Sequence, residues 1–352
     1  YKKNINFIYY IFKSKTIIKV KFFILNSINF KPKVLHLLNK SFPEYVGYTI
    51  RSQYILFHQK KFAHPYALTR PFFIRKNEAD FFETVIYIRY PRNFGKEVVH
   101  KLCYYHPKII KYYNLVYYSY LQIPKKFIEK IVIKKDIDLI HGHTPYIFSS
   151  LGEKVAHKNR IPFVYEVRGL WEDTNVILGL YKENDSKYLE MRQQETDLMK
   201  KADAVITLGN LMKKELINRG IEKDKLYVIP NAVDIESFQP IPSDMKLKKT
   251  FEIENKHIIA YIGSIREIEG IETLIKTISV VRNELKDIIL LLVGGYDRRY
   301  YVKLQNLIKK LSLDQVVLFT GNVPPSEINR YYSIADIIVI PRINSRLNRI
   351  VT

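Results

Sequence analysis

The stretch HIIAYIGSIREIEG, residues 257–270, decides the fold together with LIHGHTP at residues 139–145. Each begins with an apolar run of strand length and ends in a turn of small or polar residues. Such a run predicts a buried strand of a parallel sheet. In open α/β sheets, ligands bind in the crevice outside the carboxyl ends of the strands. The two stretches therefore predict an α/β enzyme built from two facing Rossmann-like halves.

The bulk composition agrees with two domains. A chain of 352 residues exceeds the size at which single cores stop growing, about 250–300 residues. Its 47% hydrophobic and 26% charged residues are typical of a globular protein. The single cysteine, Cys103, excludes a disulfide framework and a cysteine-based zinc site, and it fits a reducing compartment.

The positive charge is concentrated in the first third of the chain. Residues 1–135 carry 26 Lys and Arg against 6 Asp and Glu, whereas the rest carries 31 against 29. A basic, aromatic-rich surface suits an anionic membrane surface, a nucleic acid or a phosphorylated acceptor. The plain alternative is a solvated surface in a lysine-rich proteome. No nucleic-acid-binding signature accompanies the charge, so we expect no nucleic-acid partner.

The chain divides into four segments. Residues 1–32 form a basic, aromatic extension, whose apolar runs are too short and too interrupted by lysine for a membrane span or a signal peptide. Residues 33–240 alternate strands and helices, as expected of a parallel sheet. Residues 241–256 are rich in lysine and read as a linker, and residues 257–352 begin a second α/β domain.

Two further stretches in the first domain carry candidate site residues. The loop 39–47 contains Gly47 and precedes a helix that carries Arg51, so free helix N–H groups there could bind an anion. An ordinary strand-to-helix turn explains the same pattern. The segment VRGLWED, 167–173, places Arg168 and Glu172 directly after an apolar strand. Loops in that place carry function more often than packing, and the alternative is a structural salt bridge.

The order of the pieces resembles the GT-B glycosyltransferases, and more narrowly glycosyltransferase family 4, over residues 34–352. The segments that carry the resemblance are VGYTIR, YEVRGLWED, ADAVIT, YVIPNAVDIESF, YIGSIREIEG, LLLVGG and FTGNVPPSEINRYYSIADIIVIPR. VGYTIR and YEVRGLWED look most like transferases of exopolysaccharide assembly. The resemblance implies retaining transfer from a nucleotide-sugar, with the donor against the C-terminal domain and the acceptor against the N-terminal one.

The resemblance implies a donor site around the second glycine-rich turn. Arg266 matches the basic residue that contacts the donor phosphates, where a cation stabilises the leaving group. Gly47 matches the glycine loop beside the diphosphate, since a residue without a side chain permits close approach. The other donor-side positions are Gly263, Ser264, Asn322 and Val323. Ordinary exposed turns are the alternative at each of these positions.

The resemblance implies two catalytic residues, Arg266 and His143, that converge on one activated sugar. His143 matches a histidine that lies near the reacting sugar in related enzymes. It could bond to the donor sugar or assist proton transfer from the acceptor hydroxyl, and the alternative is a satisfied residue at a strand end. His141 lies within the strand and is read as structural. Arg51, Arg168 and Glu172 are assigned to acceptor binding.

Two features depart from the family pattern. Glu269 stands where many relatives carry a lysine that pairs with the diphosphate. The family's pair of glutamates, seven residues apart, has no match before Thr352, so we expect a second domain that is incomplete at its C-terminus and a chain that is a fragment.

The sequence thus predicts a glycosyltransferase of exopolysaccharide synthesis, cytoplasmic or peripheral at the inner membrane face, that acts on a glycan or lipid-linked acceptor. We expect no cofactor and no metal site, because no Asp-x-Asp motif ends a strand. The alternatives are a catalytically incomplete nucleotide- or glycan-binding fragment and a sugar-nucleotide 2-epimerase of the same fold. The donor, the acceptor and the oligomeric state are not predicted.

Overall fold

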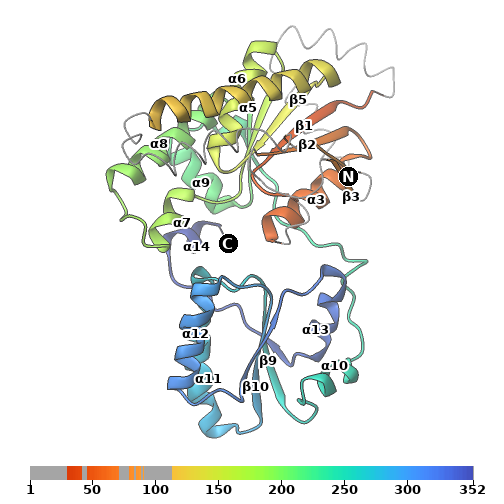
Figure 1. Cartoon of the computed structure of the whole chain (residues 1–352), viewed down its shortest axis with the longest axis vertical. Helices are drawn as coiled ribbons and strands as arrows, with labels where there is room; N and C mark the ends of the chain where they lie inside the picture. The colour runs from red at the N-terminus through yellow and green to blue at the C-terminus, as the bar shows by residue number, and fades with distance from the viewer. Residues whose placement is uncertain are drawn as a thin grey trace. The chain divides into compact units, whose positions relative to one another are not determined.

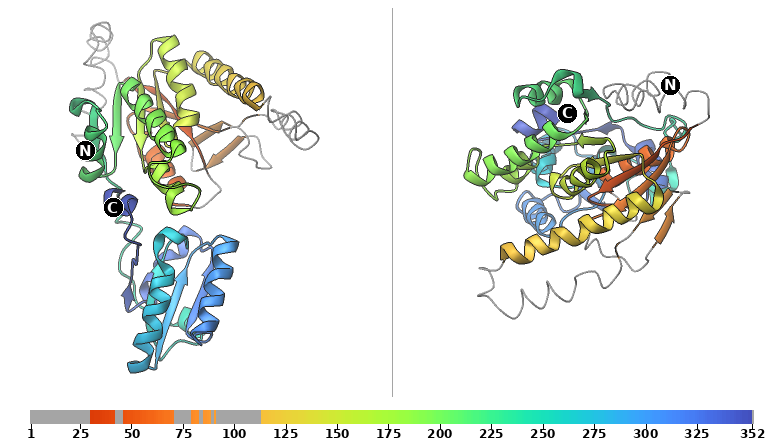
Figure 2. Two further views of the ribbon diagram at one scale, coloured as in Figure 1. Left: turned by 90° about the vertical axis from the view of Figure 1, so that its left-hand side faces the viewer. Right: turned by 90° about the horizontal axis from the view of Figure 1, so that it is seen from above.

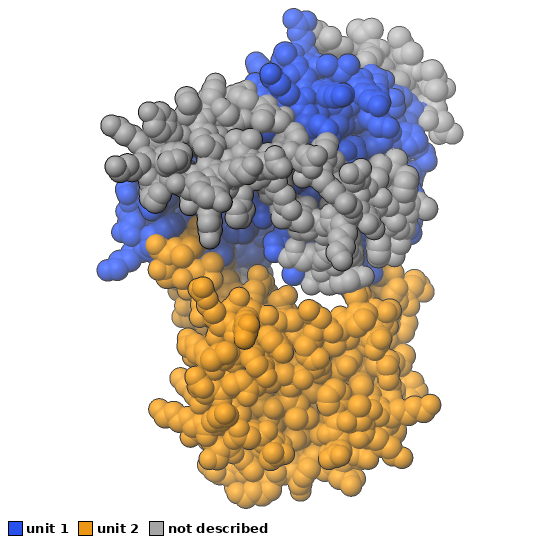
Figure 3. Space-filling model, viewed as in Figure 1, with its two compact units in different colours: residues 1–174, 181–230, 350–352 blue, residues 175–180, 231–349 orange. Residues whose placement is uncertain are grey.

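The computed structural model describes residues 30–41, 46–70, 79–82, 85–88, 90 and 113–351. These residues form two compact units (Figures 1 and 3). Unit 1 comprises residues 1–174, 181–230 and 350–352, and unit 2 comprises residues 175–180 and 231–349. Of the basic extension, only residues 30–32 belong to the described part.

Unit 1 is built on a sheet whose described strands follow the order β3-β4-β2-β1-β5-β6-β7-β8. Neighbouring strands pair in parallel, except that β3 pairs antiparallel with β4 at one edge. The prediction of a parallel sheet is therefore confirmed. The strands are β1 (Lys33–Leu38), β2 (His64–Thr69), β3 (Ala79–Phe82), β4 (Val85–Ile88), β5 (Leu139–His143), β6 (Phe163–Val167), β7 (Ala204–Thr207) and β8 (Leu226–Val228).

Helices of unit 1 pack on both faces of this sheet. The helices are α3 (Gly47–Gln59), α5 (Tyr113–Lys135), α6 (Tyr146–Asn159), α7 (Trp171–Ile177), α8 (Ser186–Lys201) and α9 (Asn210–Asn218), with a 3-10 turn η2 (Lys223–Lys225). Helix α6 packs on β5 and β6 and against α5 and α8 (Figure 2). It approaches closely because Gly142 has no side chain: a Cβ there would lie 2.8 Å from Ser149 Cβ. Helix α3 supplies the partners of side chains on the opposite face.

Unit 2 is built on a parallel sheet in the order β11-β10-β9-β12. Helices α11 and α12 cover one face of this sheet and α10 and α13 the other (Figure 1). Their apolar side chains form a buried cluster on each face. The strands are β9 (His257–Ile262), β10 (Ile288–Val293), β11 (Val317–Gly321) and β12 (Ile337–Ile338). The helices are α10 (Met245–Thr250), α11 (Ile271–Glu284), α12 (Arg298–Lys310) and α13 (Ile328–Ile334), with 3-10 turns η3 (Glu267–Glu269) and η4 (Pro325–Glu327). Helix α14 (Arg346–Val351) begins in unit 2, and its last two residues are assigned to unit 1.

The segment expected to be a linker, 241–256, is folded into unit 2. Helix α10 begins after Asp244, whose side chain accepts a hydrogen bond from the Leu247 N–H at 2.9 Å. Leu247 is buried and packs in the same cluster as Tyr331 of α13. The lysines that suggested a linker lie on the outside of this short helix, and burial of Leu247 and Ile253 places the segment in unit 2.

Candidate active site

Four polar side chains gather on one face of the unit 1 sheet, at the carboxyl ends of β1, β5 and β6. His36 pairs with His141 across β1 and β5, and His143 pairs with Glu166 across β5 and β6. Side chains two residues apart on a strand share a face, so His141 and His143 point to the same side. All four residues are buried.

Glu166 is the acceptor at the centre of this group. Its Oε1 accepts hydrogen bonds from Arg51 Nε at 2.9 Å and from Arg168 Nε at 3.1 Å. Its Oε2 lies 3.1 Å from His143 Nδ1 and 3.3 Å from His141 Nε2. Burial alone would raise the pKa of Glu166, but the Arg168 guanidinium and contacts with the two histidines hold that pKa well below its usual range. The carboxylate is therefore ionised at neutral pH.

Arg168 ties the end of β6 to the start of α3. Its Nη1 donates to Tyr48 O at 3.1 Å and to Ser52 Oγ at 2.7 Å, and its Nη2 lies 2.9 Å from His143 Nδ1. The guanidinium also stacks over the Tyr48 ring, 4.6 Å from its centroid. The predicted residue Arg168 thus lies beside His143, in the region assigned to the acceptor.

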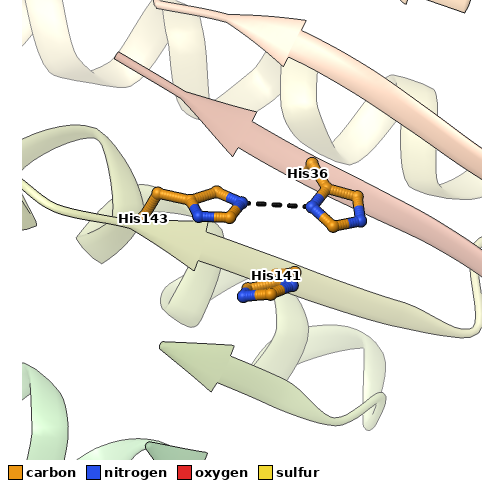
Figure 4. A group of neighbouring side chains, drawn as sticks. All are labelled: His36, His141 and His143. Atoms are coloured by element: carbon orange, nitrogen blue, oxygen red, sulfur yellow. Dashed lines mark hydrogen bonds between the residues drawn. The ribbon is translucent and has the colours of Figure 1, made fainter. Parts of the chain in front are cut away.

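The three histidines form a buried cluster with ring centroids 4.3, 4.7 and 5.4 Å apart (Figure 4). His143 Nε2 lies 3.1 Å from His36 Nδ1, and His36 Nε2 lies 2.7 Å from Gln59 Oε1 of α3. Burial lowers the pKa of His36 and of His143 well below 6.5, and at His143 the neighbouring Arg168 lowers it further. Both imidazoles are neutral at pH 7. The His143 side chain is 0% exposed, so it could contact a sugar only after the groups that cover it move.

The same three imidazoles form the candidate metal cluster within the described part of the chain: one nitrogen from each lies within 4.8 Å of the others. Neutral imidazoles are ordinary metal ligands. However, two guanidinium groups bind the single carboxylate beside them, and a divalent cation would add to that positive charge. The three ring nitrogens are therefore suitable metal ligands, but the positive charge of the two guanidinium groups disfavours a cation at this place.

The other two acceptor-side predictions lie in different places. Arg51 projects from α3, donates to Glu166, and also donates to Ile229 O and Pro230 O at 3.1 and 3.2 Å. Glu172 is 0% exposed in the first turn of α7 and pairs with Arg219 Nη2 at 2.6 Å. The structure therefore places Arg51 with Arg168 but puts Glu172 in a separate ion pair. The acceptor role of each stays a prediction.

In unit 2, three turns meet at the carboxyl ends of neighbouring strands. Backbone hydrogen bonds join them: Gly263 N donates to Val293 O at 2.9 Å, and Gly294 N donates to Gly321 O at 3.1 Å. The approach is close because a Cβ on Gly294, at φ +136°, would lie 2.0 Å from Gly263 O. The donor-side predictions Gly263, Ser264, Asn322 and Val323 therefore lie along one edge of the sheet.

Arg266 extends from this edge into solvent. Its side chain is 64% exposed and its Nη2 lies 3.6 Å from Glu269 Oε1. Glu269, which replaces the lysine of many relatives, is buried and also accepts from Arg342 Nε at 3.1 Å. The carboxylate thus pairs with two arginines, and neither of them is buried.

The remaining glycine, Gly47, is the first residue of α3 in unit 1. It is exposed, and a Cβ placed on it would meet nothing within 4 Å among the described residues. Open space beside a helix N-terminus is compatible with the predicted anion loop. His143 and Arg266 belong to different units, so their predicted convergence on one sugar stays a prediction.

No helix among the described residues combines the length and apolar character required to span a bilayer.

Two family profiles match consecutive parts of the chain. The profile described as "Glycosyltransferase Family 4" matches residues 78–237, and the one described as "Glycosyl transferases group 1" matches residues 243–345. The chain belongs to glycosyltransferase family 4. The predicted family and the GT-B type of fold are confirmed.

Curated relatives in this family are distant and longer. The chain is 22% identical to a D-inositol 3-phosphate glycosyltransferase of Kineococcus radiotolerans, over 60% of this chain and 50% of the relative. It is also 22% identical to an alpha-galactosylglucosyldiacylglycerol synthase of Streptococcus pneumoniae, over 59% of this chain and 55% of the relative. The matched region thus spans about half the length of these relatives.

Solved glycosyltransferases share the fold over nearly the whole chain. Sucrose-phosphate synthase from Thermosynechococcus elongatus superposes with a TM-score of 0.67 at 17% identity, covering 90% of this chain and 76% of that one. HepE from Anabaena, solved in complex with UDP-glucose, gives a TM-score of 0.62 at 17% identity, covering 87% and 72%. At such identities the likeness establishes the fold of the family and no residue role.

Sequence reasoning missed several members of the unit 1 group, namely His36, Tyr48, Ser52, Gln59 and Glu166. A signal was present for two of them. Glu166 and His36 are polar residues inside otherwise apolar strands, and such residues are rarely buried without a partner. The three helical residues carried no comparable signal, because only the packing of α3 brings them to the strands.

Proposed function

We propose that this chain carries the two Rossmann-like parts of a retaining glycosyltransferase that moves a sugar from a nucleotide-sugar to a glycan or lipid-linked acceptor in cell-surface polysaccharide synthesis. The observation that supports this proposal best is the carboxyl edge of unit 2, where backbone hydrogen bonds join three turns beside the exposed Arg266. HepE, which has this fold, was solved with UDP-glucose. A nucleoside diphosphate is the leaving group in such a transfer.

The proposed chemistry depends on charge stabilisation. Negative charge develops on the diphosphate as the sugar leaves, and a cation placed there in advance lowers the barrier. Arg266 suits this role because its guanidinium is exposed and its contact with Glu269 is long. Gly263, Ser264, Asn322 and Val323 would surround the nucleotide, and Gly47 would admit the diphosphate beside α3. His143, Arg168, Arg51 and Glu172 are assigned to the sugar and acceptor side.

A donor screen tests this proposal. Binding of UDP-, ADP- and GDP-sugars to the full chain is measured by calorimetry, and release of nucleoside diphosphate is measured in the presence of glycan and lipid-linked acceptors. We expect one nucleotide-sugar to bind, and Arg266→Ala to weaken that binding about tenfold, a loss of about 1.4 kcal/mol. Lys276→Ala, an exposed cation on α11, is the matched control and should bind normally.

The outcomes separate the alternatives. Turnover that requires both donor and acceptor supports the transferase. Binding without turnover indicates a nucleotide-binding fragment. A product that is an epimerised nucleotide-sugar indicates the 2-epimerase. No binding by any nucleotide-sugar, or equal binding by Arg266→Ala, contradicts the proposal.

The basic first third of the chain is proposed to dock on an anionic membrane surface. Each lysine or arginine near such a surface contributes about 1 kcal/mol and is screened within a Debye length. The chain should therefore sediment with phosphatidylglycerol vesicles at low salt and be released at high salt. Vesicles of phosphatidylcholine alone are the control. Binding that salt does not weaken, or equal binding to both vesicles, contradicts electrostatic docking.

A further inference from the structure

The carboxylate at the centre of the unit 1 site belongs to a residue that sequence reasoning did not select. Glu166 is 1% exposed and lies within 3.4 Å of nitrogens from four residues: Arg51, Arg168, His141 and His143. It joins an arginine from α3 and an arginine from the end of its own strand. A buried carboxylate with two guanidinium partners is held in a fixed position, because neither partner can move without leaving a charge unpaired.

Arg168 is fixed in turn, because each of its N–H groups has an acceptor. Nε donates to Glu166 Oε1, Nη1 donates to Tyr48 O and Ser52 Oγ, and Nη2 lies near His143 Nδ1 at 2.9 Å and Glu166 Oε2 at 3.4 Å. The five donors of a guanidinium form a rigid planar fork. Glu166 holds the Nε side of the guanidinium and α3 holds Nη1. The plane of the group is thereby fixed, and this sets the direction in which Nη2 points to His143.

The contacts of His143 decide its tautomer. His143 Nδ1 lies 2.9 Å from Arg168 Nη2, which can only donate, and 3.1 Å from the ionised Glu166 Oε2, which can only accept. The other end of the hydrogen-bond chain decides between the two: Gln59 Oε1 accepts from His36 Nε2, so His36 Nδ1 is the acceptor for His143 Nε2. His143 Nδ1 then carries no proton, and Nε2–H donates to His36 Nδ1. The hydrogen bonds run in one direction, from Arg168 to Gln59.

We propose that Glu166 is the positioning residue of this site: it orients Arg168, which holds His143 in the neutral Nε2–H tautomer and pins the first turns of α3. Both ring nitrogens of His143 are then engaged, one with Arg168 and one with His36. His143 therefore has a structural role and does not take a proton. The structural half of this inference stands alone. Its kinetic half rests on the proposed function, since the pinned helix begins at Gly47 of the proposed diphosphate loop.

Histidine NMR tests the structural half without a substrate. In the full chain labelled with ¹⁵N-histidine, long-range ¹H–¹⁵N spectra distinguish protonated from bare ring nitrogens, and His143→Asn identifies the His143 signals. We expect His143 to show a bare Nδ1 and a protonated Nε2. A protonated Nδ1 in the wild type would overturn the proposal.

Arg168→Lys provides the matched perturbation. It keeps the charge beside Glu166, so it avoids an unpaired carboxylate, but one ammonium cannot reproduce the planar fork. We expect His143 to become a mixture of both tautomers. Arg192→Lys, in a partly exposed pair with Glu215, should leave the His143 signals unchanged. An unaltered His143 tautomer in Arg168→Lys would show that Arg168 does not set it.

A metal ion is the competing use of the three imidazoles, and Co²⁺ distinguishes the two. Nitrogen coordination in a tetrahedral site gives visible d–d absorption, and ligation would change the bonding of His36 and His143. We expect no such absorption on adding Co²⁺ to the full chain beyond that of His36→Asn. Stoichiometric absorption that is absent in His36→Asn would establish a metal site and overturn the hydrogen-bond chain.

Kinetics test the second half once a donor is known. Glu166→Gln should reduce kcat roughly 100-fold, as expected when reacting groups are displaced by about 1 Å, with a smaller change in the donor KM. Glu166→Asp, which keeps the charge, should restore part of kcat. Equal kcat in wild type and Glu166→Gln overturns the positioning role, and equal loss in both variants marks Glu166 as merely structural. Failure of every nucleotide-sugar to bind would instead count against the proposed function and leave the tautomer result intact.

Discussion

Unit 1 and unit 2 both gather charged side chains at the carboxyl ends of parallel strands, yet they surround that charge differently. In unit 1, Glu166 is 1% exposed and its cations bind other protein groups as well. In unit 2, the Arg266 side chain is 64% exposed and its ion pair with Glu269 is 3.6 Å long. The first edge satisfies its charges within the protein, whereas the second leaves a cation available to a ligand.

This difference separates two kinds of contribution. A buried ion pair depends on both partners, since loss of one leaves an uncompensated charge in a medium of low dielectric constant. An exposed cation contributes little to folding because solvent and salt screen it. We therefore expect substitutions in the unit 1 group to change stability first and substitutions at the unit 2 edge to change binding first.

The largest effect should come from Glu166→Ala. Removing this carboxylate leaves Arg51 and Arg168 without their buried counter-ion, and such losses destabilise by about 3–5 kcal/mol. Urea unfolding followed by the fluorescence of Trp171, the single tryptophan, reports on unit 1. The control is Glu222→Gln, an exposed acid 66% accessible, which should change stability by less than about 1 kcal/mol. Equal effects of the two substitutions would contradict the comparison.

A second buried acid of unit 1 should make stability depend on pH. Burial raises the pKa of Glu195 to about 8, although Tyr165 donates it a hydrogen bond. Between about pH 4.5 and 8 the folded state keeps a proton that the unfolded state releases, so stability falls as pH rises through this window, by about 1.4 kcal/mol per pH unit. Glu195→Gln should remove this slope in urea unfolding followed by Trp171.

The matched acid in unit 2 should behave differently. Lys256 lowers the pKa of Asp287 through a hydrogen bond at the surface. Asp287 therefore stays ionised in both states above about pH 5, and Asp287→Asn should leave the slope between pH 5 and 8 unchanged. A slope that survives in Glu195→Gln would show that another group of unit 1 titrates in this range.

Gly294→Ala should break the edge of unit 2 by steric contact. Its Cβ would lie 2.0 Å from Gly263 O at a φ of +136°, and strain of this kind costs roughly 1–3 kcal/mol. Gly321→Ala is the matched control, because φ there is +71° and a Cβ would meet nothing within 4 Å. It should cost only about 1–2 kcal/mol for the left-handed backbone. Gly294→Ala should unfold at a lower temperature and bind nucleotide more weakly than Gly321→Ala. Equal losses in the two variants would show that the close approach of the two turns is not required.

The two edges also differ in how far the sequence predicted them. In unit 2, local pattern predicted that Gly263, Arg266 and Asn322 lie in turns next to apolar runs, while their donor-binding roles stay predictions. Of the unit 1 group, the sequence selected only His143, Arg168 and Arg51. Glu166 and His36 lie inside strands. There the sequence pattern predicts the strand, but it does not predict which side chains of neighbouring strands come into contact. Tyr48 and Gln59 reach the group only because α3 packs on that face.

The linker prediction shows the same limit. Residues 241–256 have the composition of a connection, but Leu247 packs in the core of unit 2. A single buried leucine among lysines is too weak a periodic signal to predict a helix of six residues. Tertiary packing, which sequence composition does not encode locally, decides both cases.

The smallest effect on stability should come from Arg266→Ala. The exposed guanidinium makes one long contact to Glu269, which keeps Arg342 at 3.1 Å, so the free energy of unfolding should change by less than about 0.5 kcal/mol. The same variant is expected to weaken nucleotide-sugar binding about tenfold, and this pairing of near-normal stability with impaired binding is the reverse of Glu166→Ala. Chemical unfolding of unit 2 and calorimetric titration on one preparation measure both quantities. If Arg266→Ala unfolded unit 2 instead, the cation would belong to the fold, and the contrast between a self-satisfied edge and an open one would be lost.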